Sequence, residues 1–254
     1  MALSPSFKSV VLAKRPKDHI EADTFRVEES PTPAAGSLKD GEVLFQSNYL
    51  SLDPAMRGWL NDTRSYIPPV KIGAVMRGNG VGTIVASKSS KFRTGETASA
   101  MCGWSEIAVL KEDLVDKLDL PINGTMTDSL ADEVHQQFGI LNVGRVKAGD
   151  FVVVSGAAGA TGSVVGQIAK LKGATVLGIT GSDDKCKWLV NELGFDNALN
   201  YKDKSFAKNF RAATKQLIDV FFDNVGGEVL DLALARAKEH STFVMCGGIS
   251  QYVE

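Results

Sequence analysis

The second half of the chain, from about residue 140 onward, alternates continuous apolar runs with amphipathic stretches. The runs Phe151–Ser155 and Ala174–Thr180 have the unbroken apolar character of strands that are buried on both faces of a parallel sheet. Between them, Gly162–Lys172 carries apolar residues at helical spacing. The same alternation predicts helices at Asp183–Leu193, Lys204–Lys215 and Glu228–Lys238, and strands at Asn197–Tyr201, Ile218–Phe222 and Thr242–Cys246. Because strands that alternate with helices imply right-handed crossovers, we expect an α/β fold with a doubly wound parallel sheet.

The first half has a different pattern, in which short apolar runs are separated by Gly and Pro. Its enrichment in Val, Ile and Phe favours a β-rich, barrel-like half that extends to about Leu120. The expected strands are Phe7–Leu12, Glu42–Leu50, Gly80–Ala86 and Trp104–Leu110. Phe92–Glu96 predicts a turn before a further strand. Between the two halves, Ile122–Gln137 is polar and has only weak helical periodicity.

Composition and charge narrow the class of protein. The 254 residues correspond to about 1.7 domains of ordinary size. The net charge of −2 argues against a general electrostatic surface for nucleic acid or for an anionic membrane. The three cysteines include no CxxC pair, which excludes a disulfide scaffold and a cysteine-rich zinc site. No apolar run reaches the roughly 18 residues of a membrane span, and the first residues lack the pattern of a signal peptide, so we expect a cytoplasmic protein.

The segment SGAAGATGS, Ser155–Ser163, lies between a predicted strand and a predicted helix, which is where a dinucleotide-binding fingerprint is found. Gly156 and Gly159 allow the backbone to turn tightly and to approach a pyrophosphate, and Gly162 allows the helix to pack closely on the strand. The free N–H groups at the start of the helix offer partial positive charge to the phosphates. The spacing is GxxGxxG rather than GxGxxG, so a turn that serves packing alone remains an alternative.

The residues after the second strand indicate which dinucleotide is bound. NAD-binding folds place Asp or Glu at this strand end to bind the ribose 2′-hydroxyl, but here the strand ends at Thr180-Gly181. Lys185, in the first turn of the next helix, is unfavourable for the helix dipole, which favours a role in binding a 2′-phosphate. The pattern therefore predicts NADP(H). Two alternatives stay open: Lys185 is a solvated helix residue, or Asp183 or Asp184 reaches a ribose hydroxyl.

The sequence shows no cluster typical of metal or nucleophilic catalysis. Catalytic zinc needs three or four converging ligands, and the only histidine early in the first half, His19, lies far from any cysteine. No Ser-His-Asp arrangement or paired carboxylate motif is found either. We therefore expect chemistry without a metal.

Five motifs in the same order resemble the zinc-independent medium-chain dehydrogenase/reductases, and within them the branch of prostaglandin reductase, leukotriene B4 12-hydroxydehydrogenase and NADP-dependent 2-alkenal (double-bond) reductase. They are Asn48–Gly58, Ser155–Ser163, Gly181–Lys185, Asp223–Gly227 and Cys246–Tyr252. The resemblance implies a GroES-like catalytic domain at residues 1–121 and an atypical linker at 122–140. It also implies a Rossmann NADP-binding domain at residues 141–254, with a sheet that is incomplete at the C-terminus.

The resemblance also implies roles for particular residues. The pyrophosphate would be held by Gly159, Ala160, Thr161 and Gly162. Lys185 and Tyr201 would contact the 2′-phosphate, and Asn224 the ribose region. The loop under the nicotinamide half would consist of Cys246, Gly247, Gly248, Ile249, Ser250, Gln251 and Tyr252. Asn48 and Tyr49 would approach nicotinamide and substrate, with Tyr49 as the catalytic candidate and Tyr252 as a second proton donor. Plainer alternatives are a turn residue for Asn224, a core aromatic for Tyr49 and packing for Cys246.

The implied reaction is hydride delivery from NADPH to the β-carbon of an α,β-unsaturated aldehyde or ketone, with a small molecule as the partner and a homodimer as a possible assembly. Such a reaction needs little acid–base machinery, because positioning and the cofactor supply most of the chemistry. Two departures from the family pattern stand out: the polar segment 122–137, and a chain that stops soon after the fifth Rossmann strand. They leave the hypothesis of a relative that binds cofactor but is catalytically impaired. A third hypothesis is an NADPH quinone reductase that uses the same fold and cofactor.

Overall fold

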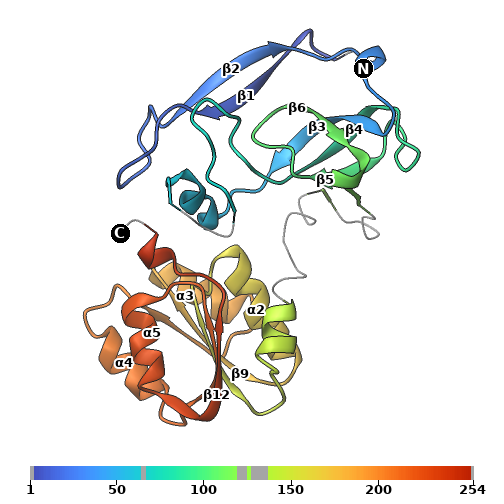
Figure 1. Cartoon of the computed structure of the whole chain (residues 1–254). Coiled ribbons are helices and arrows are strands. Elements are labelled where there is room, and N and C mark those ends of the chain that lie inside the picture. The colour runs from blue at the N-terminus through green and yellow to red at the C-terminus, as the bar shows by residue number, and fades with distance from the viewer. Residues whose placement is uncertain (1–2, 64–66, 119–124, 127–136, 253–254) are drawn as a thin grey trace. The chain divides into compact units, whose positions relative to one another are not determined.

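The computed structural model describes residues 3–63, 67–118, 125–126 and 137–252, and divides the chain into two compact units. The first unit is Met1–Leu130 and the second is Ala131–Glu254 (Figure 1). Most of the polar segment Ile122–Gln137, including residues 122–124 and 127–136, lies outside the described residues. No helix among the described residues is long and apolar enough to cross a membrane.

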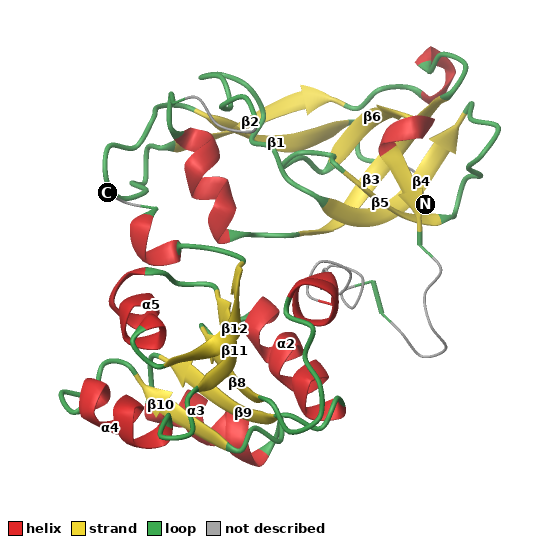
Figure 2. Ribbon diagram, turned by 60° about the horizontal axis from the view of Figure 1, so that its bottom comes forward, coloured by secondary structure: helices red, strands yellow, loops and turns green. Residues whose placement is uncertain are grey.

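The second unit is built on a parallel sheet of five strands in the order β10-β9-β8-β11-β12. The strands are β8 (Phe151–Ser155), β9 (Thr175–Thr180), β10 (Asn197–Asn200), β11 (Ile218–Asp223) and β12 (Ala237–Met245). The helices are the π-helix η5 (Phe138–Val143), α2 (Ala160–Leu171), α3 (Asp183–Asn191), α4 (Phe206–Ala213), α5 (Gly227–Leu234) and the short 3-10 helix η6 (Ile249–Gln251). Figure 2 shows helices on both sides of the strands.

Successive side chains of β8 point to opposite faces of the sheet, and both faces are covered by helices. Val152 and Val154 belong to a buried cluster that includes Val165 of α2 and Leu189 of α3. The intervening residues Phe151 and Val153 belong to a second buried cluster that contains Phe206 and Phe210 of α4 and Val229 of α5. Every residue of β8 is buried, as expected for a central strand of a doubly wound sheet. The predicted α/β fold is therefore confirmed for this half.

The first unit is β-rich, as the short apolar runs predicted. A hairpin pairs β1 (Ser6–Leu12) with β2 (Phe25–Pro31), and a five-stranded antiparallel sheet has the order β6-β3-β4-β5-β7. Its strands are β3 (Glu42–Leu50), β4 (Gly80–Ser87), β5 (Thr97–Ala100), β6 (Ile107–Lys111) and β7 (Val115–Lys117). Its described residues also form the short 3-10 helices η1 (Ala35–Ser37), η2 (Pro54–Leu60) and η3 (Glu112–Leu114). The turn predicted at Phe92–Glu96 contains Gly95 at φ +93°, directly before β5.

Two expected boundaries are wrong. The strand expected at Trp104–Leu110 begins only at Ile107, because the backbone of Trp104 is used elsewhere, donating to Met76 O (2.8 Å). The helix expected at Glu228–Lys238 ends at Leu234, and β12 begins at Ala237 rather than at Thr242. Ala237 has helical spacing from α5 but pairs with Ile218 of β11 instead. The register of β12 then shifts, so that Thr242 pairs with Val220.

Candidate cofactor site

The candidate residues of the second unit all follow the carboxyl ends of the five parallel strands. Gly159–Gly162 follows β8, Lys185 follows β9, Tyr201 follows β10, Asn224 follows β11 and Cys246–Tyr252 follows β12. Parallel strands have their carboxyl ends at the same edge of the sheet, so the topology brings these segments to one edge. In open α/β sheets, ligands bind in the crevice at this edge.

The Gly-rich turn has the close packing that its sequence predicts. Gly156 has φ +58°, which favours glycine, and a side chain at Gly162 would place its Cβ 2.5 Å from Gly156 O. Gly159 is the N-cap of α2, with an ordinary extended backbone. Within the described residues, the first backbone N–H of α2 to donate to a turn carbonyl is that of Ser163, to Gly159 O (3.0 Å). The N–H groups of Ala160, Thr161 and Gly162 are therefore directed out of the helix end, as an anion site requires.

The start of α3 and the end of β10 form a second part of this edge. Ser182 is the N-cap of α3, and its hydroxyl accepts a hydrogen bond from Lys185 N (3.4 Å). The ring of Tyr201 lies over Gly181, where a Cβ would come within 3.1 Å of it. Tyr201 is 48% exposed and Lys185 is exposed, so both side chains are accessible to a ligand.

A buried carboxylate at the end of β11 links three of these segments, and the sequence did not single it out. Asp223 has no exposed surface, and its oxygens accept hydrogen bonds from the Ser155 hydroxyl (2.7 Å) and from the backbone N–H groups of Val225 and Gly226 (3.0 Å each). The Ser155 hydroxyl in turn accepts from Asn224 N (2.8 Å). An acidic residue that ends an apolar strand just before Gly226 and Gly227 is a capping signal that could have identified it.

The same network fixes Asn224 and the loop after β12. The side-chain amide of Asn224 donates to Ser155 O (2.7 Å), which ties it to the end of β8. Asp223 O accepts from Cys246 N (2.8 Å) and from Gly247 N (3.0 Å). Val225 O accepts from Ser250 N (3.1 Å) and from the Ser250 hydroxyl (2.6 Å). The turn after β11 therefore holds the Cys246–Tyr252 loop through its backbone carbonyls.

Tyr252 and Cys246, in the Cys246–Tyr252 loop, are the candidates for a proton donor and for a packing residue, respectively. The Tyr252 hydroxyl accepts a hydrogen bond from Gly248 N (3.3 Å) and so closes the loop on itself. Burial and then the nearby Asp223 carboxylate raise the pKa of the Cys246 thiol. A raised pKa keeps sulfur in its protonated form, which disfavours a nucleophilic role for Cys246.

Asn48 and Tyr49 belong to the first unit, where they line a groove of about 500 Å³. Its other walls are Lys8, Val10, Val27, Ser47, Leu50, Trp104, Ser105 and Glu106. The pairing of β3 with β4 is irregular between Ser47 and Tyr49, and Tyr49 is 50% exposed, so it is not a core aromatic. The Asn48 side-chain oxygen accepts a hydrogen bond from the Thr83 hydroxyl (3.2 Å).

Within the described residues, no group of three or more His, Cys, Asp or Glu side chains could hold a metal ion.

Comparisons with known proteins agree with this geometry. Residues 8–118 match the family model described as the N-terminal domain of oxidoreductase, and residues 160–254 match the model described as zinc-binding dehydrogenase. The putative NADP-dependent oxidoreductase YfmJ of Bacillus subtilis (strain 168) is 39% identical over 98% of this chain and 74% of its own length. The chain belongs to the zinc-independent medium-chain dehydrogenase/reductase family.

Two further members of this family are similar over most of the chain. Prostaglandin reductase 1 of Bos taurus is 41% identical over 85% of this chain and 65% of its own length. The crystal structure of CurA in complex with NADPH, from Vibrio vulnificus, is 37% identical and superposes with a TM-score of 0.90 over 96% of this chain and 73% of that one. The resemblance drawn from the five sequence motifs is thus confirmed, and so is the α/β fold class with a β-rich first half.

Proposed function

We propose that this chain binds NADPH along the carboxyl edge of its parallel sheet and reduces the C=C bond of α,β-unsaturated aldehydes or ketones. The observation that carries the proposal is the convergence of the Gly-rich turn, Lys185, Tyr201, Asn224 and the Cys246–Tyr252 loop at that one edge. Support also comes from relatives whose names or titles include NADP, NADPH or prostaglandin reductase.

The residues at this edge fit a dinucleotide phosphate. A Cβ at Gly162 would lie 2.5 Å from Gly156 O, so this glycine allows the helix start, with its free N–H groups, to pack closely on the turn that would hold a pyrophosphate. Gly159, Ala160, Thr161 and Gly162 would hold the pyrophosphate with their backbone N–H groups. Lys185 and Tyr201 would hold the 2′-phosphate through one charged and one neutral hydrogen bond.

The remaining residues would orient the reacting half of the dinucleotide. When bound, the cofactor supplies the hydride that reduces the β-carbon of the substrate. Asn224, fixed by Ser155 O, and Cys246–Tyr252, fixed by the backbone of Asp223 and Val225, would define the floor of the nicotinamide site. Because hydrogen bonds within the protein already fix these groups, little conformational entropy is lost in ordering them when the cofactor binds.

The groove of the first unit supplies the proposed substrate contacts. Its walls combine apolar side chains such as Val10, Leu50 and Trp104 with the polar groups of Asn48 and Tyr49. This combination suits a small carbonyl compound with an apolar tail. The Tyr49 hydroxyl is the proposed donor that polarises the carbonyl or supplies the proton to the α-carbon.

The test is turnover of a small cyclic enone by the purified chain with NADPH that carries deuterium at the transferred position. We expect deuterium at the β-carbon of a saturated ketone product, a preference for NADPH over NADH, and no reaction with the matching ketone that lacks the C=C bond. In Tyr49→Phe, kcat should fall about a hundredfold with little change in folding stability.

Two other results separate the remaining hypotheses. Binding of NADPH without turnover of any enone would identify a cofactor-binding relative that is catalytically impaired. Faster turnover of a quinone than of enones would identify a quinone reductase on the same fold. A chain that binds neither NADPH nor NADH would overturn the proposed cofactor site itself.

A further inference from the structure

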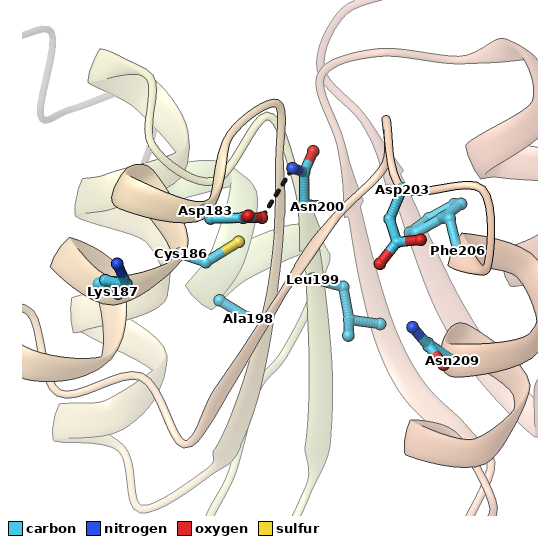
Figure 3. Close-up of a pocket in the computed structure, with 9 residues that line it drawn as sticks. All are labelled: Asp183, Cys186, Lys187, Ala198, Leu199, Asn200, Asp203, Phe206 and Asn209. Carbon is cyan, nitrogen blue, oxygen red and sulfur yellow. Dashed lines mark hydrogen bonds between the residues drawn. The ribbon is translucent and has the colours of Figure 1, made fainter.

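A hollow of about 310 Å³ lies beside the proposed adenosine end of the cofactor site, between α3, β10 and α4 (Figure 3). At its rim, the side-chain amide of Asn200 donates a hydrogen bond to the Asp183 carboxylate (2.8 Å). Figure 3 shows the Asp183 side chain reaching from α3 toward Asn200, at the end of β10. The first residue of α3 is thus bound to the last residue of β10.

Asp183 occupies an informative place in the chain. It lies about 20 residues after the Gly-rich turn and just beyond the second strand, where dinucleotide-binding sheets place the acid that binds a ribose 2′-hydroxyl. An acid free at this position would favour NADH and would repel the 2′-phosphate of NADPH. The chain therefore carries a residue of the type that selects NAD at an edge that we propose for NADPH.

The structure gives each of the two acids of this turn a polar partner. Asp183 accepts from Asn200, and the Asp184 carboxylate lies 3.5 Å from the Lys187 ammonium, one turn along α3. In contrast, neither Lys185 nor Lys202 forms an ion pair with a carboxylate in the described part of the chain. The carboxylates of Asp183 and Asp184 thus each have a partner within the protein, whereas the ammonium groups of Lys185 and Lys202 have no carboxylate partner among the described residues and can bind an anion.

Asn200 also positions the segment that carries Tyr201. Its side-chain oxygen accepts a hydrogen bond from Lys202 N (3.1 Å), so one amide holds both the start of α3 and the turn after β10. Tyr201 lies between Asn200 and Lys202 in the sequence. Its ring lies over Gly181, and the Lys202 ammonium is 5.9 Å from the ring centre. Cys186 and Asp183 line the same hollow, and burial followed by the Asp183 carboxylate raises the pKa of the Cys186 thiol.

We propose that Asn200 is a specificity-determining residue that selects NADPH over NADH by holding the Asp183 carboxylate at the hollow. Held there, Asp183 is not available to a ribose 2′-hydroxyl, and its negative charge, which the neutral amide does not cancel, is kept at the hollow rather than beside a 2′-phosphate. This inference rests on the proposed cofactor site and adds to it, because Lys185 and Tyr201 attract the phosphate whereas Asn200 removes what opposes it. Asn200 acts through Asp183 and is not a catalytic residue.

The test is a double-mutant cycle on the full chain, with dissociation constants for NADPH and NADH measured by fluorescence titration. In Asn200→Ala, the ratio of NADPH to NADH affinity should fall about tenfold, because the freed Asp183 carboxylate can accept a hydrogen bond from the ribose 2′-hydroxyl of NADH. In N200A/D183A the ratio should return to within about twofold of the unmodified chain, because the freed acid is gone. Asp183→Ala alone should leave the ratio unchanged. Asn209→Ala, at the same hollow, is the matched control and should also leave it unchanged.

A second pair of variants covers the case in which Asn200→Ala does not fold. Asn200→Asp keeps the shape and the acceptor for Lys202 N but loses the donor and adds a negative charge, so the ratio should fall for both reasons, and the charge-neutral swap separates them. The swap N200D/D183N exchanges donor and acceptor at constant charge and should restore it.

Three outcomes decide the matter. An unchanged ratio in folded Asn200→Ala or Asn200→Asp overturns the inference while leaving the proposed function intact. A ratio that stays low in N200A/D183A also overturns it, since Asn200 would then act through the turn at Lys202. If the unmodified chain binds neither nucleotide, the proposed function fails and this inference fails with it.

Discussion

The two units place their candidate residues in different ways. In the second unit, the candidate side chains follow the ends of five parallel strands and meet at one edge because the topology aligns those ends. In the first unit, Asn48 and Tyr49 lie inside β3, next to an irregular pairing with β4. The difference teaches that a parallel sheet gathers candidate residues at its carboxyl edge, whereas in the antiparallel unit an irregular register within one strand presents Asn48 and Tyr49.

The largest expected effect is in the second unit, at Asp223. Asp223→Ala leaves the Ser155 hydroxyl and two backbone N–H groups buried without their acceptor, so we expect the free energy of unfolding to fall by about 3 kcal/mol. NADPH affinity should fall too, because the Cys246–Tyr252 loop depends on the same turn. Urea denaturation and fluorescence titration measure both quantities. The exposed Asp231→Ala is the control, and equal stability of the two variants would contradict the network.

The matching change in the first unit is Gly82→Ala. Gly82 pairs with Ser47 beside the irregularity of β3, and an added Cβ would lie 1.9 Å from Gln46 O. The backbone must shift, so we expect a loss of about 2 kcal/mol in the free energy of unfolding. Gly58→Ala, where nothing lies within 4 Å of the added Cβ, should change stability little. If denaturation shows Gly82→Ala to be as stable as Gly58→Ala, the β3–β4 register is wrong.

Lys185, at the start of α3, provides a test of whether the edge of the second unit binds the 2′-phosphate. Lys185→Ala should weaken NADPH binding about tenfold, which is about 1.4 kcal/mol, and leave NADH binding unchanged. Lys172→Ala removes an exposed lysine at the end of α2 opposite the Gly-rich turn and should leave the NADPH dissociation constant unchanged. Titration of both variants with both nucleotides is the measurement. Equal losses for NADPH and NADH in Lys185→Ala would mean that Lys185 does not contact the 2′-phosphate.

The smallest expected effect is a pH dependence at the opposite end of the sheet. Burial alone would raise the pKa of Asp196, but the Lys170 ammonium (2.8 Å) and Val176 N (2.6 Å) hold it below its ordinary value. Its stabilisation is therefore present at neutral pH and is lost as the pH falls below about 4. Asp196→Asn should lower the free energy of unfolding by less than about 1 kcal/mol at pH 7. Denaturation curves of the two proteins should converge in acid, and a constant difference down to low pH would contradict this assignment.

The pattern of the sequence predicts the second unit well for a physical reason. Short continuous apolar runs such as Phe151–Ser155, bounded by turn residues, are typical of strands buried on both faces, and their ends locate the candidate edge. The end of α5 was misplaced because Ala237 satisfies helical spacing and strand pairing equally, and only its contact with Ile218 decides between them. Asp223 was missed because its role depends on Ser155, which lies 68 residues earlier in the chain.

The sequence pattern does not predict which residues line the groove of the first unit. Lys8, Asn48 and Glu106 come from three separate segments that only the paired strands bring together. The Asn200–Asp183 contact is similar, since each residue is an ordinary polar residue at an element boundary until the fold joins them.

The three cysteines have a consequence for the durability of such a catalyst. Burial raises the pKa of the Cys102 thiol, whereas for the half-buried Cys186 and the exposed Cys246 partial desolvation of the sulfur and then the Asp183 or Asp223 carboxylate raise it. Only thiolates add readily to electrophilic carbon, and conjugated aldehydes and ketones are electrophiles of this kind. A raised pKa lowers the thiolate fraction of each of these cysteines, which slows their alkylation by the compounds that we propose the chain consumes.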